Sequence, residues 1–467
     1  MARIFISAAH KSSGKTTLAI GLCAALQSQG LRVQPFKKGP DYIDPMWLGR
    51  AAQRPCQNLD FHTMQREEIL ATYHQSTHGA DIAVIEGNKG LYDGLDLDGS
   101  NSNAALAKLL HAPVILVIDA RGMTRGIAPL ILGYQNFDHD IQIAGVILNQ
   151  LGGHRHEQKL RQVIEHYTQV KVLGAVQHDD ELAMVERHLG LVPANEAPHV
   201  EKKIRLLANR IHAQTDLAEI IRIARNATPL IPSRDVTSNV TPLKNSVRLG
   251  IARDRAFGFY YAGDLAALTV AGAELVFFDT LNDTTLPPMD GLLIGGGFPE
   301  THMAELEKNS ALRQAIRHAI EHGMPAYAEC GGLMYLARRI TWNDTSHEMV
   351  GVIPADIVMH RKPQGRGYVY LQATGHAPWP IQPLPTDKPV AAHEFHYSSL
   401  ENLPAQTQFA YDVVRGSGID GRHDGIVYKN LLASYSHLRH TQQSPWASQF
   451  VQFIRSCKQT RPKVNPT

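Results

Sequence analysis

Two stretches of the sequence hold residues whose types and spacing suit chemistry, and the first is a phosphate-loop pattern. The apolar run Arg3 to Ala8 leads into Ala9-His10-Lys11-Ser12-Ser13-Gly14-Lys15-Thr16-Thr17, after which a helical pattern continues. In this context Gly14 lets the backbone approach phosphate, Lys15 neutralises the β and γ oxygens, and the Thr16 hydroxyl can bind Mg²⁺. With Ser13 and Thr17 beside them, these residues predict an ATP site. The motif is a variant, because Ala9 replaces the usual first glycine.

A Mg²⁺ ion bound to a triphosphate also needs carboxylate ligands, because hard cations take oxygen donors. Glu86 ends the apolar run Ile82 to Ile85, and Asp41 follows another apolar run. We predict a metal site made of Thr16, Asp41 and Glu86. The alternative for each carboxylate is a helix cap, and Lys37 is either a phosphate contact or a solvated lysine.

The second chemical stretch is Met324-Pro325-Ala326-Tyr327-Ala328-Glu329-Cys330-Gly331-Gly332-Leu333-Met334-Tyr335-Leu336. It predicts a buried strand, a tight turn with two glycines and a helix, which places Cys330 on a nucleophile elbow. A thiol at a helix N-terminus is favoured as the thiolate, the form that attacks the carboxamide of glutamine. The alternative is an inert buried cysteine.

A cysteine nucleophile also needs a base and an oxyanion site. His437 follows the apolar run in Leu432-Ala433-Ser434-Tyr435-Ser436-His437-Leu438, and we predict that it is the base. Gly297 lies in a glycine-rich loop after another apolar run. Its amide and that of Gly331 form the predicted oxyanion site.

These residues require elements that bring strand ends together, and the apolar runs supply them. Short β-branched runs alternate with helical patterns, which is typical of parallel sheets covered by helices. The runs are Arg3 to Ala8, Val33 to Phe36, Ile82 to Glu86, Val114 to Asp119, Ala144 to Leu148, Val172 to Ala175, Val247 to Ala252, Glu274 to Phe278, Gly291 to Ile294 and Pro325 to Ala328. We therefore predict two α/β domains: an N-terminal phosphate-loop domain with a mainly parallel sheet and helices on both faces, and a C-terminal flavodoxin-like domain.

The domain boundaries follow from length and from one polar stretch. The 467 residues exceed what one ordinary core holds. Residues 226–246 are rich in Pro, Ser, Thr and Asn and are predicted to be a linker. Residues 1–225 then form the ATP-binding domain, 247–457 the cysteine-containing domain, and 458–467 a flexible tail.

Composition excludes several classes of function. The 46 basic and 44 acidic residues give a net charge of +2, so there is no general basic field for nucleic acid. No apolar run is long enough to cross a bilayer and no secretory pattern opens the chain, so we expect a cytoplasmic protein without a membrane partner. The four cysteines lack a C-x-x-C pair, which argues against a zinc cluster or a disulfide framework.

Three motifs of the first half resemble those of the cobyrinic acid a,c-diamide synthase family. They are Gly39-Pro40-Asp41-Tyr42-Ile43-Asp44, Glu86 with Gly90-Leu91-Tyr92-Asp93-Gly94, and Glu186-Arg187-His188-Leu189-Gly190-Leu191-Val192-Pro193. That family's first domain is similar to dethiobiotin synthetase, which also activates a carboxylate with ATP. The resemblance implies that Lys15 and Thr16 handle phosphate and metal, that Asp41 and Glu86 complete the Mg²⁺ site, and that Lys37 faces the transferred phosphoryl group.

The second half resembles class I, triad-type glutamine amidotransferases, in the branch fused to such ATP domains. His393-Glu394-Phe395-His396-Tyr397-Ser398 matches an internal motif of that branch. One departure matters, because Arg439 stands two residues after His437, where many glutaminases carry the glutamate that orients the histidine. The third member of the triad therefore stays open.

The resemblance implies a tetrapyrrole-derived polycarboxylate, amidated on its a and c acetate groups with ammonia from glutamine. Loops near the substrate depart from the corrin pattern at Met46-Trp47-Leu48, at Asn88-Lys89 and between Asp96 and Asn103. Sirohaem or another sirohydrochlorin derivative is therefore an alternative substrate to cobyrinic acid. The residues that the resemblance places beside the substrate are Tyr42, Asp44, Trp47, Lys89, Tyr92 and Asp93.

Two other classes of function remain as alternatives. A nucleotide-switched binding ATPase has no need for Cys330, His437 or Gly297, and a tetrapyrrole carrier with decayed sites has no need for Lys15. The resemblance also raises a homodimer, since relatives with this first domain often pair. No motif in the sequence decides the oligomeric state, the metal content of the substrate or the order of amidations.

Overall fold

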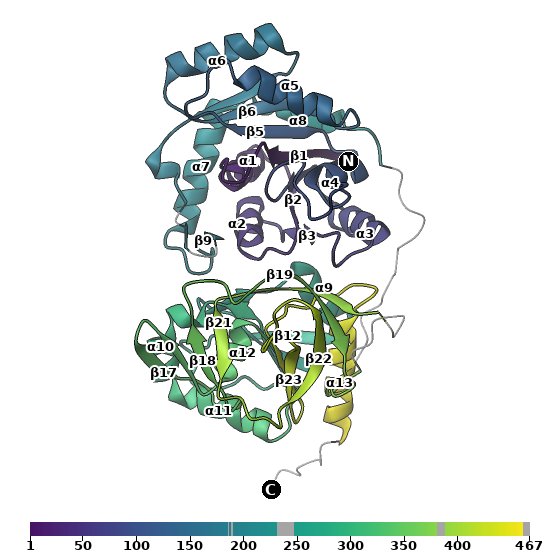
Figure 1. Cartoon of the computed structure of the whole chain (residues 1–467), viewed down its shortest axis with the longest axis vertical. Helices are drawn as coiled ribbons and strands as arrows, with labels where there is room; N and C mark the ends of the chain where they lie inside the picture. Colours follow the sequence, from purple (N-terminus) through teal and green to yellow (C-terminus); the bar gives the residue numbers. More distant parts are fainter. Residues whose placement is uncertain (185, 188–189, 231–246, 381–387, 461–467) are drawn as a thin grey trace. The chain divides into compact units, whose positions relative to one another are not determined.

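The computed structural model describes residues 1–184, 186–187, 190–230, 247–380 and 388–460. The chain folds into two compact units, residues 1–237 (unit 1) and 238–467 (unit 2) (Figure 1). Most of the predicted linker and residues 461–467 of the predicted tail lie outside the described part. The last helix, α13 (Trp446–Thr460), continues three residues into the predicted tail.

Unit 1 is built on a seven-stranded sheet in which all neighbouring strands are parallel. Its strand order is β3-β2-β4-β1-β5-β6-β7. The strands are β1 (Ala2–Ala8), β2 (Val33–Lys38), β3 (Gln57–Leu59), β4 (Ile82–Glu86), β5 (Val114–Asp119), β6 (Ile143–Leu151) and β7 (Val172–Gln177). β1, β2 and β4 are buried almost throughout, as expected for parallel strands covered on both faces.

Helices cover both faces of this sheet. One face packs against α3 (Arg66–Ser76), α4 (Asn103–Leu109), α5 (Ile127–Phe137) and α6 (His154–Tyr167), whose apolar side chains join those of the strands in one core. α1 (Lys15–Ser28) packs against α2 (Ile43–Ala52) and α7 (Val200–Gln214). The remaining elements are a short helix η1 (Asp180–Leu182), the paired β8 (Glu186–Arg187) and β9 (Gly190–Leu191), and α8 (Leu217–Arg225).

Unit 2 contains a nine-stranded sheet whose first five strands are parallel neighbours in the order β12-β10-β13-β15-β24. Numbered along the chain, this is the order 2-1-3-4-5 of flavodoxin-like sheets. These strands are β10 (Val247–Ala252), β12 (Ala273–Phe278), β13 (Gly291–Ile294), β15 (Ala326–Glu329) and β24 (Leu431–Ser434). The predicted fold class is confirmed for both units.

An antiparallel extension of this sheet was not predicted from the sequence. β23 (His423–Tyr428), β22 (Gln408–Arg415), β19 (Gly365–Ala373) and β20 (Val390–His396) continue it beyond β24. A separate four-stranded sheet contains β16 (Arg339–Trp342), β17 (Thr345–Glu348), β18 (Asp356–Met359) and β21 (Ser398–Glu401). Some of these pairings, such as β18 with β21 and β19 with β22, join distant segments of the chain and depend on tertiary packing rather than on local propensity.

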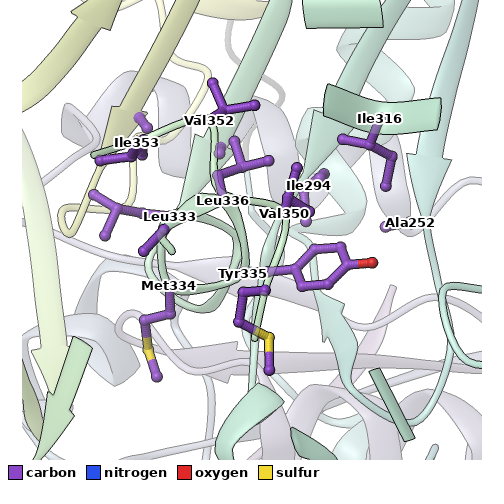
Figure 2. Close-up of a cluster of buried hydrophobic side chains, with 14 of the residues drawn as sticks. Ala252, Ile294, Ile316, Leu333, Met334, Tyr335, Leu336, Val350, Val352 and Ile353 are labelled. Carbon is purple, nitrogen blue, oxygen red and sulfur yellow. The ribbon is translucent and has the colours of Figure 1, made fainter. Parts of the chain in front are cut away.

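The remaining elements of unit 2 enclose its core. They are β11 (Phe257–Phe259), α9 (Ala262–Val270), β14 (Gly296–Gly297), η2 (Pro299–Thr301), α10 (Met303–Lys308), α11 (Ser310–Glu321) and α12 (Gly331–Leu336). Figure 2 shows that α12 presents Leu333, Tyr335 and Leu336 to the side chains of neighbouring elements. The turn that contains Cys330 is therefore followed directly by a helix whose side chains are closely packed in the core.

None of the helices in the described part of the chain combines the length and the apolar character needed to cross a membrane.

Candidate active sites

The phosphate loop of unit 1 is shaped by its own hydrogen bonds. Gly14 has a φ of +81°, and a Cβ at this position would lie 2.2 Å from Asn149 Nδ2. The same Asn149 nitrogen donates a hydrogen bond to the Ser13 carbonyl at 2.9 Å, while Ser13 Oγ donates to the His10 carbonyl at 2.8 Å. Only glycine fits this left-handed, crowded position. The loop ends at Lys15, the first residue of α1, whose side chain is buried.

Beside the loop lies a cluster of one ammonium group and three carboxylates. Lys37 Nζ is 2.5 Å from Asp44 Oδ2, 3.1 Å from Glu86 Oε1 and 3.9 Å from Asp41 Oδ2. Thr16 Oγ1 lies within hydrogen-bond distance of two carboxylates, 2.5 Å from Glu86 Oε1 and 3.2 Å from Asp44 Oδ2. The structure therefore brings together the predicted Lys37, Thr16, Asp41 and Glu86, and adds Asp44, which we had expected to contact the substrate.

Asp41 has a second role at the start of α2. Its Oδ1 accepts hydrogen bonds from the amides of Ile43 at 2.9 Å and Asp44 at 3.1 Å. The helix-cap alternative therefore describes one of its oxygens, while its other oxygen faces Lys37. This arrangement holds Asp41 rigidly near the phosphate loop.

Burial and charge together set the protonation of this cluster. Burial alone would lower the pKa of Lys37, but the carboxylates of Asp44 and Glu86 raise it above its usual range. Burial raises the pKa of Glu86, and burial together with the charge of Asp44 raises the pKa of Asp41 to about 7. For Lys15, burial and then the nearby charge of Lys37 lower the pKa. The charge of Lys37 opposes the increase in pKa of both Asp41 and Glu86.

A pocket adjoins the phosphate loop. Gly14, Thr17 and Asn149 line it together with the more distant Gln177 and Arg210. Leu18, Val176 and Leu207 also line it, and an apolar lining with a few polar groups next to the loop suits the nucleoside part of a bound nucleotide. Sequence reasoning identified Thr17 but missed Asn149, because that residue reaches the loop from β6, more than 130 positions away.

The remaining residues predicted to contact the substrate have different environments. Trp47 is only 3% exposed, and its indole nitrogen donates a hydrogen bond to the Val192 carbonyl at 2.9 Å, an arrangement that favours a packing role. Tyr42 is buried just before α2. The loop after β4 carries the exposed Lys89, the half-buried Tyr92 and the exposed Asp93, whose Oδ2 accepts the Gly90 amide at 2.9 Å.

Nothing in the sequence pattern singled out Lys38, the neighbour of Lys37 on β2. Its side chain is buried, and burial lowers its pKa to about 8, although Asp60 opposes this effect. Successive side chains of a strand point to opposite faces, so two adjacent lysines have opposite electrostatic environments.

The nucleophile elbow of unit 2 has the form predicted from the sequence. β15 ends at Glu329, α12 begins at Gly331, and Cys330 between them has a φ of +48°. Positive φ is uncommon for a non-glycine residue and marks a constrained turn. The Cys330 amide donates to the Ser434 carbonyl at 2.7 Å, and Sγ lies 3.9 Å from the Phe395 carbonyl.

The two predicted oxyanion residues lie close together. A Cβ on Gly331 would lie 2.9 Å from both the amide nitrogen and the carbonyl oxygen of Gly297. A Cβ on Gly297 would lie 1.9 Å from the Ala256 carbonyl oxygen. Both positions thus require glycine, and their backbones approach each other as a pair of oxyanion donors must.

His437 lies next to Cys330 and contacts a carboxylate. It is 3% exposed, and its Nδ1 is 3.3 Å from Glu329 Oε2. Burial alone would lower the pKa of His437, but its hydrogen bonds with Cys330 and Glu329 raise it to about 10. The structure therefore joins the predicted nucleophile and base and adds Glu329.

The predicted internal motif lies on β20, next to this site. The His393 amide and carbonyl pair with those of His437 in an antiparallel bridge, and the two imidazoles stack with centroids 4.9 Å apart. Glu394 is buried and accepts the amides of Ser417 at 2.6 Å and Gly418 at 2.8 Å. β20 thus fixes the backbone of His437 and supplies the Phe395 carbonyl beside Cys330.

Two protein-family models match the chain, one in each unit. The CobQ/CobB/MinD/ParA nucleotide binding domain matches residues 4–192, and the CobB/CobQ-like glutamine amidotransferase domain matches residues 248–445. The cobyrinate a,c-diamide synthase of Magnetococcus marinus is 48% identical over 458 residues, which are 97% of each chain. The proteins of that name from Methanosarcina acetivorans and Archaeoglobus fulgidus are 42% and 40% identical and cover 93% and 96% of this chain and 92% and 96% of their own.

This similarity extends over almost the whole chain, and each matched domain model contains one of the two sites. The phosphate loop with its charged cluster lies in the first, and the Cys330–His437 pair lies in the second. The chain belongs to the cobyrinate a,c-diamide synthase family.

Proposed function

We propose that this protein uses ATP and glutamine to amidate the a and c acetate carboxylates of cobyrinate. The observation that carries the proposal is that relatives of this name match both units of the chain. Each unit contains one set of predicted reactive side chains: Lys15, Thr16 and Lys37 in unit 1, and Cys330 and His437 in unit 2. A nucleotide-switched ATPase or a decayed carrier would not need both sets.

In unit 2 the thiolate of Cys330 attacks the carboxamide carbon of glutamine, and the amides of Gly297 and Gly331 stabilise the oxyanion. His437 gives a proton to the departing ammonia, which leaves a thioester on Cys330. His437 then takes a proton from water, which attacks the thioester and releases glutamate. The hydrogen bond between His437 and Cys330 provides the proton path that these steps require.

In unit 1 a substrate carboxylate oxygen attacks the γ-phosphorus of ATP, which gives an acyl phosphate and ADP. The buried ammonium groups of Lys15 and Lys37 offset the negative charge of the phosphoryl group in transfer. Ammonia then attacks the acyl carbon and phosphate departs, which leaves the amide. Asn149 holds the phosphate loop in shape through the Ser13 carbonyl.

The donor set of unit 1 fits Mg²⁺ arriving with ATP. Thr16, Asp41, Asp44 and Glu86 offer only oxygen, and Glu86 Oε2 is buried without a hydrogen-bond partner in the described residues. Within those residues no three His, Cys, Asp or Glu side chains form a metal-binding group by themselves, but Mg²⁺ is usually held by one or two carboxylates together with substrate phosphates. When bound, the ion would neutralise charge on the β and γ phosphates.

The experiment is an amidation assay on cobyrinate, sirohydrochlorin and sirohaem in parallel, with products counted by mass spectrometry. We expect ATP- and glutamine-dependent diamidation of cobyrinate. Reaction with sirohaem or sirohydrochlorin alone would overturn the choice of substrate while leaving the chemistry in place.

Two variants separate the half-reactions in the same assay. Cys330→Ala should abolish the use of glutamine and keep the use of added ammonia, whereas Lys15→Ala should abolish both. The matched controls are Cys457→Ala and Lys171→Ala, which remove a half-buried cysteine and an exposed lysine away from both sites. A Cys330→Ala protein that still used glutamine would contradict the assignment of the nucleophile. Light scattering of the same samples decides between a monomer and the predicted homodimer.

A further inference from the structure

A cysteine–histidine pair works only if the imidazole presents the correct nitrogen to the thiol. A hydrogen-bond acceptor on the other nitrogen usually fixes that tautomer. In this chain the residue two positions after His437 is Arg439, a guanidinium that can only donate. Its side chain is buried and lies over the Tyr261 ring, 4.9 Å from the ring centroid. Arg439 therefore cannot accept a proton from Nδ1 of His437.

The carboxylate that contacts His437 comes from the residue immediately before the nucleophile. Glu329 Oε2 is 3.3 Å from His437 Nδ1, and both side chains are buried. The other oxygen, Oε1, accepts the Leu438 amide at 2.9 Å and the Tyr327 hydroxyl at 2.5 Å. Two donors thus hold one oxygen in place and leave the second directed at the imidazole.

The topology explains why this position can reach the histidine. β15 and β24 are parallel neighbours that pair Glu329 with Ser434 at their ends. The chain leaves β24 there, and three residues later His437 is held against β20 by the His393 backbone. The end of the nucleophile strand and the histidine therefore meet at one edge of the sheet.

Other buried carboxylates of unit 2 have different partners. Asp424 accepts the amides of Gly425, Tyr435 and Ser436, and Asp264 accepts the His440 amide and the Trp446 indole. These contacts fix loops, whereas the contact from Glu329 reaches a ring nitrogen of the base.

We propose that Glu329 is the positioning residue of the glutaminase site: its carboxylate accepts the Nδ1 proton of His437 and so directs Nε2 to Cys330. The third member of the catalytic triad then precedes the nucleophile directly instead of following the histidine. Protonated His437 also gains a negatively charged neighbour, which favours the imidazolium–thiolate pair over the neutral pair. This inference rests on the glutaminase half of the proposed function.

Glu329→Gln is a sharp test because it preserves the fold-related contacts. The amide oxygen of the new side chain can still accept from the Leu438 amide and the Tyr327 hydroxyl. Its NH₂ group, however, would donate to Nδ1 of His437 and stabilise the tautomer with the proton on Nε2. That tautomer cannot accept the proton of the Cys330 thiol.

The assay is glutamate release from glutamine by the full chain, with ammonia-dependent amidation measured in parallel. We expect Glu329→Gln to lower kcat for glutamate release by on the order of 10² to 10⁴-fold, as loss of the orienting carboxylate does in triads, with KM changed less than about threefold. Ammonia-dependent amidation should stay at the wild-type level. Glu321→Gln, which removes a glutamate on α11 that pairs with Arg317, is the matched control.

Two readouts distinguish a positioning role from a structural one. The rate of Cys330 alkylation by iodoacetamide, followed against pH by mass spectrometry, should rise at a higher pH in Glu329→Gln than in the wild type. In the wild-type chain, ¹⁵N NMR with histidine labelling, assigned by comparison with His437→Gln, should show that Nδ1 of His437 keeps its proton when the imidazole becomes neutral above its pKa of about 10.

The proposal is overturned if Glu329→Gln keeps glutamate release within about threefold of the wild type, or if the neutral imidazole of wild-type His437 has an unprotonated Nδ1. Failure of the broader proposal has another signature, because no tetrapyrrole would then be amidated with either glutamine or ammonia, whatever residue stands at position 329.

Discussion

Two adjacent lysines on β2 should have opposite effects on stability. Lys37 is surrounded by Asp44, Glu86 and Asp41, which raise its pKa, whereas burial lowers the pKa of Lys38 to about 8. Lys37→Met leaves buried carboxylates without their counter-charge. Lys38→Met removes a buried ammonium whose charge the fold disfavours. The same change of residue type, one position apart, therefore tests the electrostatics while burial and side-chain length stay matched.

The expected magnitudes follow from these environments. Removing one partner of a buried ion pair costs about 3–5 kcal/mol, so Lys37→Met should destabilise unit 1 by that amount at pH 7. At roughly 2–4 °C per kcal/mol for a unit of this size, its melting temperature should fall by about 6–20 °C. For Lys38, a pKa lowered from 10.5 to about 8 corresponds to a penalty of about 3 kcal/mol at pH 7, which Lys38→Met removes.

The pH dependence of each effect has a definite sign. Lys37 has a raised pKa in the folded state, so its stabilisation is complete at neutral pH and is lost only at high pH. Without it, the pKa values of Asp41 and Glu86 rise further, so the deficit of Lys37→Met should shrink as the pH falls and these groups take up protons. The folded state loses the Lys38 proton near pH 8 and the unfolded state near pH 10.5, so the advantage of Lys38→Met should disappear between these two pH values.

Hydrogen–deuterium exchange of β1 and β4 is the assay, because it reports on unit 1 alone. Calorimetry of the full chain at pH 5.5, 7 and 10 supplies the melting temperatures. If both variants destabilise unit 1 equally at pH 7, packing rather than charge dominates at this strand and our account of the charged cluster is wrong.

Three further predictions follow from the geometry. Gly297→Ala should lower glutaminase activity about 10² to 10³-fold and spare ammonia-dependent activity, because its Cβ would lie 1.9 Å from the Ala256 carbonyl and displace an oxyanion donor; steady-state kinetics with both nitrogen sources tests this. Gly14→Ala should weaken ATP binding measured by calorimetry, since the added Cβ meets a side-chain nitrogen at 2.2 Å. Trp47→Phe should cost about 1–3 kcal/mol in denaturant unfolding, because it leaves the buried Val192 carbonyl unpaired. A raised KM for the tetrapyrrole with unchanged stability would instead show that Trp47 contacts the substrate.

The sequence by itself determined the features that depend on neighbouring residues. The phosphate loop before α1 and the elbow at Cys330 each combine an apolar strand, a turn with required glycines and a helix start within about 20 positions. The parallel character of both sheets was also predictable, because buried strands alternating with helices leave few other arrangements.

Only the tertiary structure decided which side chains meet across long stretches of chain. It placed Asp44 on Thr16 and Lys37, and it gave the adjacent Lys38 a different environment because side chains alternate across a strand. It also brought Glu329 to His437, 108 positions away, through the pairing of β15 with β24. Local patterns cannot predict such contacts, because strand order and register are set by packing of the whole sheet.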